Sequence, residues 1–149
     1  MAITQALPNS FKKQLLDGDM DFSVAGASPT AGDKFKLALY VSTATLGAAT
    51  TSYTTSGEVS SSGTGYTTGG KALVNSGTSV VSTKAFTNFA NLSFTSVTLT
   101  ARGCLIYNTS FSNAAVAVLN FGADKTATSG TFTVQFPAFT SSAAIIQIS

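Results

Sequence analysis

The stretch LSFTSVTLTARGCLIYN, from Leu92 to Asn108, alternates apolar and polar residues for most of its length. Alternation with a period of two is typical of a β-strand that has one buried face. It slips by one residue near Ser96, and Gly103 interrupts it before a mainly apolar end. We therefore predict a strand with a β-bulge or bend near Ser96 and a second irregularity at Gly103. The apolar residues that set the pattern are Leu92, Phe94, Val97, Leu99 and Ala101.

Further strands are predicted on both sides of this stretch. FKLALYV (residues 35–41) and GTFTVQF (130–136) alternate in the same way, and AAIIQIS (143–149) is predicted as a final strand. AAVAVLNF (114–121) is short and apolar at nearly every position, so we predict a central strand that is buried on both faces. The side chains expected to point into the core are Phe35, Leu37, Leu39, Val118, Phe132, Val134 and Phe136.

The composition also favours a sheet protein. The 149 residues include 20 Ser, 23 Thr and 11 Phe, and only 9% are charged. Thr and Phe favour pleated, half-buried positions. We predict an all-β fold with seven to nine short strands, a two-sheet antiparallel sandwich that is jelly-roll-like, with a closed barrel as the alternative. Residues 1–30 would form an N-terminal arm with a short helix, and residues 31–149 the sandwich domain.

The predicted arm carries one apolar face at helical spacing. Pro8 to Ser10 supply a helix start and Gly18 a stop, so a helix of about two turns is expected between them. A helix this short is marginal by itself in water, so it must dock on its own domain or on a neighbour. The residues that we predict to contact a partner are Leu7, Phe11, Lys12, Lys13, Leu15 and Leu16.

The stretch GTGYTTGGKAL, from Gly63 to Leu73, contains most of a nucleotide-binding P-loop. The P-loop needs a Ser or Thr after its lysine to bind Mg²⁺, and this chain has Ala72 there. It also needs a helix directly after the loop. The residues that follow are β-branched and interrupted by a turn, so we predict a glycine-rich turn rather than a nucleotide site.

Other kinds of catalytic or metal site find little support in the sequence. The chain has no histidine and a single cysteine, Cys104, which we expect to be buried and unreactive. Asp17, Asp19 and Asp21 resemble the start of a calcium loop, but Phe22 stands where that loop needs glycine, so a solvated turn is expected. Glu58 lies in a polar loop and is expected to be solvated as well. We predict no enzyme, no metal and no cofactor, although a carboxylate-pair glycosidase is left open because spatial pairing is invisible in a sequence.

The charge pattern bears on macromolecular partners. The net charge is +2 and the eight basic residues are dispersed, so no basic stripe is available to neutralise a run of phosphates. No segment approaches the roughly 20 apolar residues that span a bilayer. We therefore predict neither nucleic-acid binding nor membrane insertion.

The chain resembles a family of small β-rich proteins encoded among the virion genes of tailed bacteriophages. The matching stretches, in order, are ITQALPNSFKKQLLDG (followed by DF), FKLALYVSTATLGAATTSYTT, GEVSSSGTGYTTGGKAL, ARGCLIYN, AVAVLNFGADK, GTFTVQFP and AIIQI. Relatives often carry an acidic residue before the Phe-Gly of the fifth stretch. This chain has Asn120 there, which removes one carboxylate that could pair with Arg102.

The resemblance implies a virion structural protein that is assembled in the host cytoplasm. The expected role is a head decoration, or cement, protein that binds the major capsid protein and also itself, as a homo-oligomer and commonly a trimer. The alternative is a tail or fibre component that takes part in tail assembly or host recognition. For that role an exposed aromatic cluster is expected, which Tyr40, Tyr53 and Tyr66 could supply.

Overall fold

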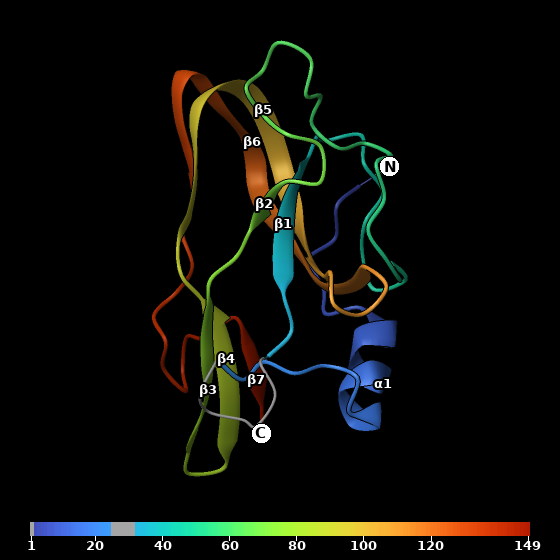
Figure 1. Cartoon of the computed structure of the whole chain (residues 1–149), viewed down its shortest axis with the longest axis vertical. Helices are drawn as coiled ribbons and strands as arrows, with labels where there is room; N and C mark the ends of the chain where they lie inside the picture. The colour runs from blue at the N-terminus through green and yellow to red at the C-terminus, as the bar shows by residue number, and fades with distance from the viewer. Residues whose placement is uncertain (1, 25–31) are drawn as a thin grey trace.

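The structure of the chain is a computed structural model that describes residues 2–24 and 32–149. It contains two antiparallel sheets and one short helix (Figure 1). The larger sheet has the strand order β2-β1-β5-β6 and the smaller one β3-β4-β7. The all-β prediction with a short N-terminal helix is confirmed, and the seven strands in the described residues match the expected number. However, β5 and β6 have 17 and 21 residues and are not the short strands that were predicted. The elements are α1 (Asn9–Asp17), β1 (Phe35–Tyr40), β2 (Lys71–Ala72), β3 (Asn75–Val81), β4 (Lys84–Phe89), β5 (Leu92–Asn108), β6 (Ala114–Val134) and β7 (Ile146–Ile148).

Strands β5 and β6 form one long ribbon that curves over the core (Figure 1). Its register shifts between Phe94 and Val97 and again between Ala101 and Gly103, so both predicted irregularities are confirmed. Ser96 has a φ of 54° at the first shift. The ribbon bends so far that the rings of Phe121 and Phe132, both on β6, lie 6.1 Å apart.

Strand β1 is buried on both faces and separates two apolar clusters. Phe35, Leu37 and Leu39 point into the larger cluster, while Ala38 and Tyr40 point into the smaller one. The seven core residues predicted from the sequence are all 7% exposed or less, so that prediction is confirmed.

Two predictions for the apolar segment 114–121 are wrong. It is not a separate short strand, because it continues to Val134 and takes in most of the predicted strand at 130–136, and it is not central. Its residues Ala114 to Val118 are buried on both faces as expected. However, β6 is the last strand of its sheet and not a central one. Its outer edge is covered instead by isolated bridges, from Ser52 to Ala114 and from Ala6 to Val118. The N-terminal segment and a loop therefore cover this edge, and the two faces pack in the two apolar clusters. A local pattern cannot distinguish such cover from flanking strands.

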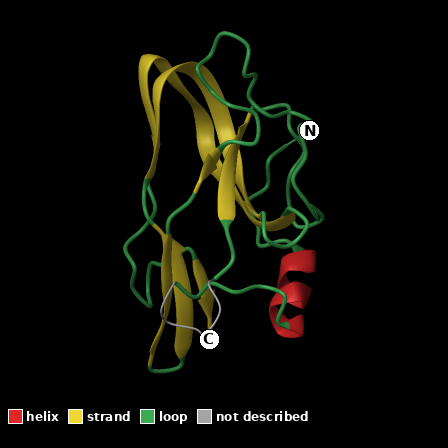
Figure 2. Ribbon diagram, viewed as in Figure 1, coloured by secondary structure: helices red, strands yellow, loops and turns green. Residues whose placement is uncertain are grey.

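Helix α1 lies at the same end of the molecule as the smaller sheet (Figure 2). It ends at Gly18, whose φ of 83° allows its N–H to bond to the Gln14 carbonyl oxygen. Phe11 is 1% exposed and belongs to the larger cluster, so the helix docks on its own domain. The predicted boundary between residues 30 and 31 lies outside the described residues. Within the described part, no helix combines the length and apolar character needed to cross a membrane.

Candidate functional site

Four tyrosines gather around Glu58 and the glycine-rich loop. The Glu58 carboxylate accepts hydrogen bonds from the hydroxyl of Tyr53 at 2.6 Å and the hydroxyl of Tyr66 at 2.7 Å. It also accepts one from the backbone N–H of Gly69 at 2.7 Å. Glu58 is thus half-buried and bound on three sides, and the expectation that it is solvated is wrong. Its partners lie only 5 to 11 residues away in the chain, but they belong to irregular loops whose sequence shows no periodicity that would bring them to the carboxylate.

The contacts of the glycine-rich loop with this cluster and with β1 explain its glycines without a bound nucleotide. Gly70 has a φ of 72°, and a Cβ atom there would lie 1.8 Å from the Leu37 carbonyl oxygen, so only glycine fits. A short strand, β2, follows the loop in place of a helix. The loop N–H of Gly69 binds the chain's own carboxylate, Glu58. The predicted turn is therefore confirmed.

The tyrosines are structural rather than exposed. Tyr40 and Tyr66 are 0% and 3% exposed, and Tyr53 stacks on the buried Tyr107 with ring centroids 4.7 Å apart. Tyr40 donates to the Thr54 carbonyl oxygen at 2.5 Å and Tyr107 to that of Gly69 at 2.6 Å. Burial, and next the nearby Glu58, raise the pKa of all four hydroxyls. Tyr40, Tyr53 and Tyr66 therefore form an internal cluster and not a surface aromatic patch.

The cysteine and the aspartates considered as reactive or metal-binding residues have structural roles instead. Cys104 is buried as predicted, and burial raises the pKa of its thiol. Asp17 pairs with Lys13 at the end of α1, while the Asp21 carboxylate accepts from the Ser23 N–H at 2.8 Å. No group of three or more acidic or cysteine side chains in residues 2–24 and 32–149 is arranged to hold a metal ion.

Arg102 finds a carboxylate other than the one that the resemblance suggested. Its Nε donates to the Asp124 carboxylate at 2.8 Å. Asn120 instead donates from Nδ2 to the Ile3 carbonyl oxygen at 2.7 Å, and its Oδ1 accepts from the Gly122 N–H. The change at position 120 therefore leaves Arg102 paired and ties β6 to the N-terminal segment.

The six predicted partner-contact residues are divided by the structure. Phe11 is in the core, whereas Leu7 and Leu15 are half-buried against it. Lys12, Lys13 and Leu16 remain exposed, and Leu16 is 90% exposed. The surface that α1 offers to a partner is therefore narrower than the predicted set.

The half-buried Leu15 of α1 lies beside an apolar surface of the smaller sheet. Val80, Ala85 and Ile148 are direct neighbours across strands β3, β4 and β7. Val80 is 68% and Ile148 52% exposed. Ile148 and Leu15 both line a small pocket of about 100 Å³ that contains no charged residue. We call Leu15, Val80, Ala85 and Ile148, together with Leu16, the exposed neighbour of Leu15 in α1, the apolar end.

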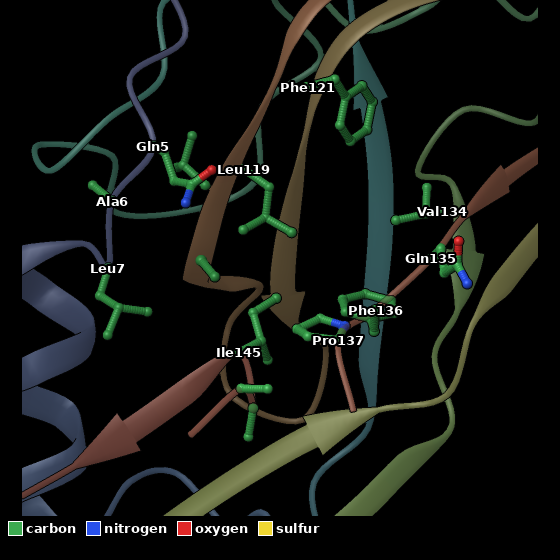
Figure 3. Close-up of a pocket in the computed structure, with 14 residues that line it drawn as sticks. Gln5, Ala6, Leu7, Leu119, Phe121, Val134, Gln135, Phe136, Pro137 and Ile145 are labelled. Atoms are coloured by element: carbon green, nitrogen blue, oxygen red, sulfur yellow. The ribbon is translucent and has the colours of Figure 1, made fainter. Parts of the chain in front are cut away.

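A larger pocket, of about 540 Å³, opens beside β6 (Figure 3). Leu119 and Phe121 project into it from β6, with Gln5 to Leu7 on one side and Val134 to Pro137 on the other. The stretch 143–145 completes the lining. The pocket is built by residues 5–7, 117–121, 134–137 and 143–145, and none of these segments alone carries a motif for it.

Comparisons with protein-family models, curated proteins and solved structures found no match to this chain.

Proposed function

We propose that this chain is a structural protein of a tailed-bacteriophage virion, and that it decorates the head by binding major capsid subunits. The proposal rests on the ordered series of family-like stretches along the whole sequence. Among the structural observations, the one that carries it is the apolar end, where α1 and the smaller sheet present uncovered aliphatic side chains together.

The apolar end has the character of a contact surface. Leu16 is almost fully exposed. Only 9% of the residues in the chain are charged, so few charged side chains are available to surround it. Clustered exposed apolar side chains rimmed by polar groups commonly mark protein-binding sites. Lys12 and Lys13 on the exposed side of α1 supply such a rim. Binding to a capsid subunit would bury this surface.

The position of the helix favours a preformed contact. Phe11 and the half-buried Leu15 fix α1 on the larger cluster, so Leu16 is presented without an ordering step on binding. Preorganised surfaces lose less conformational entropy when they bind. In this proposal the helix is a fixed contact rather than a free arm, and copies of the chain assemble around a symmetry axis, as a trimer in the simplest case.

The alternative tail or fibre role has less support from the structure. That role calls for an exposed tyrosine cluster, and Tyr40 and Tyr66 are buried. The head role is therefore the one we propose.

The proposal is tested by sedimenting the purified protein with capsids that lack it. We expect saturable binding that Leu16→Glu and Val80→Glu each weaken about tenfold or more, because each buries a charge in the contact. Ser62→Glu, in the exposed loop before β2, is the matched control and is expected to bind like the wild type. Binding to host cells but not to capsids would favour the tail role, and equal binding by all four proteins would exclude the apolar end as the contact.

A further inference from the structure

Backbone pairing on the outer edge of β6 ends at Val118 within the described residues, although the Asn120 side chain still donates to the Ile3 carbonyl oxygen at 2.7 Å. β6 is the last strand of its sheet, and the bridge between Ala6 and Val118 is the final backbone pairing on that edge. From Leu119 to Val134 the edge has no strand partner within the described residues. An unpaired edge of this kind is a template for another strand.

A side chain occupies the place where the next strand would bond. Ala6 and Val118 exchange two backbone hydrogen bonds, of 3.0 and 2.9 Å. Two residues further along β6, the N–H of Asn120 has only the side-chain oxygen of Gln5, at 3.4 Å. The main chain has turned away by this point, because the N–H of Thr4 bonds to the Leu46 carbonyl oxygen at 2.8 Å. The side-chain oxygen of Gln5 therefore accepts, through a long hydrogen bond, the N–H that a backbone carbonyl of the next strand would otherwise accept.

The pocket of about 540 Å³ lies directly beside this edge (Figure 3). Leu119, Phe121 and Ile145 give it an apolar interior, and Gln5 and Gln135 place amide groups on its lining. None of its lining residues is charged. A charged side chain buried here would lose its hydration without gaining a counter-ion, so the lining selects an uncharged ligand.

We propose that the β6 edge beyond Val118 binds an extended, uncharged, apolar peptide segment of a partner protein. Its backbone pairs with β6 at Asn120 in place of Gln5, and its apolar side chains enter the pocket. This is strand addition, in which backbone hydrogen bonds supply affinity and a pocket supplies specificity. The inference uses a surface separate from the apolar end and does not depend on the virion assignment.

The test titrates the full chain with a blocked peptide of alternating threonine and valine, followed by calorimetry. Two companion peptides carry either N-methylated amides, which cannot pair with a strand, or glutamate in place of valine. We expect saturable binding of the first peptide and at least about tenfold weaker binding of both companions, because several backbone bonds or the apolar contacts are lost. The companion peptides keep the test decisive even if a protein variant fails to fold.

Variants of the chain locate the site. Leu119→Arg is expected to weaken binding of the first peptide about tenfold or more, whereas Val80→Arg, at the apolar end, is expected to leave it unchanged. Gln5→Ala frees the Asn120 N–H and is expected to strengthen binding about two- to tenfold.

Several results would overturn the proposal. Equal binding of the N-methylated peptide would show an apolar pocket without strand pairing. Loss of binding in Gln5→Ala would make Gln5 a ligand contact rather than a stand-in. Absence of peptide binding, together with self-association that Leu119→Arg abolishes, would assign the edge to a second copy of this chain.

Discussion

The hydroxyl of the buried Tyr66 donates to the Glu58 carboxylate at 2.7 Å, and the same hydroxyl accepts from the backbone N–H of Leu39 at 3.0 Å. This relationship joins the glycine-rich loop to the central strand β1. Replacing Glu58 by Gln leaves a neutral amide with one acceptor oxygen for three donors. We expect Glu58→Gln to lower the free energy of unfolding by about 1–3 kcal/mol, because a buried hydroxyl or N–H loses its partner.

Denaturant unfolding measures this change, and Asp124→Asn is the control. Asp124 and Arg102 form a partly exposed pair, so breaking it is expected to cost less than about 1 kcal/mol. Equal effects of the two substitutions would contradict a structural role for the Glu58 cluster.

The buried tyrosines predict a loss of stability in alkali. Burial raises the pKa of Tyr40, Tyr53, Tyr66 and Tyr107 in the folded protein above the unfolded value of about 10. Below that value the hydroxyls are protonated in both states and their contribution is fully present. Above it the unfolded chain releases protons that the folded protein retains, so the free energy of unfolding falls as pH rises from about 10.

Phenolate absorbance and circular dichroism, followed together from neutral to alkaline pH, check this prediction. The phenolate signal is expected to appear with the loss of structure. Titration of all four tyrosines near pH 10 in a chain that keeps its native dichroism would contradict it.

Two glycines in the same loop region distinguish the cost of backbone strain from the cost of a steric clash. Gly63 and Gly70 have φ values of 70° and 72°, but a Cβ atom at Gly63 meets nothing within 4 Å, whereas one at Gly70 meets the Leu37 carbonyl oxygen at 1.8 Å. We expect Gly63→Ala to cost about 1–2 kcal/mol for the left-handed conformation alone. Gly70→Ala is expected to cost clearly more, about 4 kcal/mol, and thermal or denaturant unfolding of both variants compares them. Similar costs would show that the loop can move away from β1.

We predict that substitutions of Phe11 and Leu16, both in α1, have very different effects on the free energy of unfolding. Phe11→Ala removes a ring from the larger cluster and is expected to cost about 3–5 kcal/mol. Leu16→Ala changes a side chain that is 90% exposed and is expected to stay within about 0.5 kcal/mol of the wild type. Unfolding measurements on the two variants decide the point. A small effect of Phe11→Ala would mean that α1 is a detachable arm after all.

The sequence predicted the strands well because local alternation records which side of a strand is buried. Phe35, Leu37 and Leu39, and the irregularities at Ser96 and Gly103, are read from such short patterns. The same patterns could not show that β6 ends its sheet, since the cover over Val118 comes from Ala6, far away in the chain.

The candidate sites were less predictable for a related reason. Glu58 looks solvated from its neighbours, and only the fold brings Tyr53, Tyr66 and Gly69 to its carboxylate. The helical spacing correctly indicated an apolar face on α1, but it gave no means of separating Phe11, which completes the core, from Leu16, which does not.

The central proposal, that this chain is a decoration protein of a virion head, is tested most directly by the composition of purified particles of any tailed phage whose genome carries the gene for this chain. Heads and tails are separated, and the ratio of this protein to the major capsid protein is measured in each fraction by quantitative mass spectrometry. We predict a fixed ratio in the head fraction that reflects one symmetric site per group of capsid subunits. Recovery with the tails, or absence from both fractions, would contradict the claim.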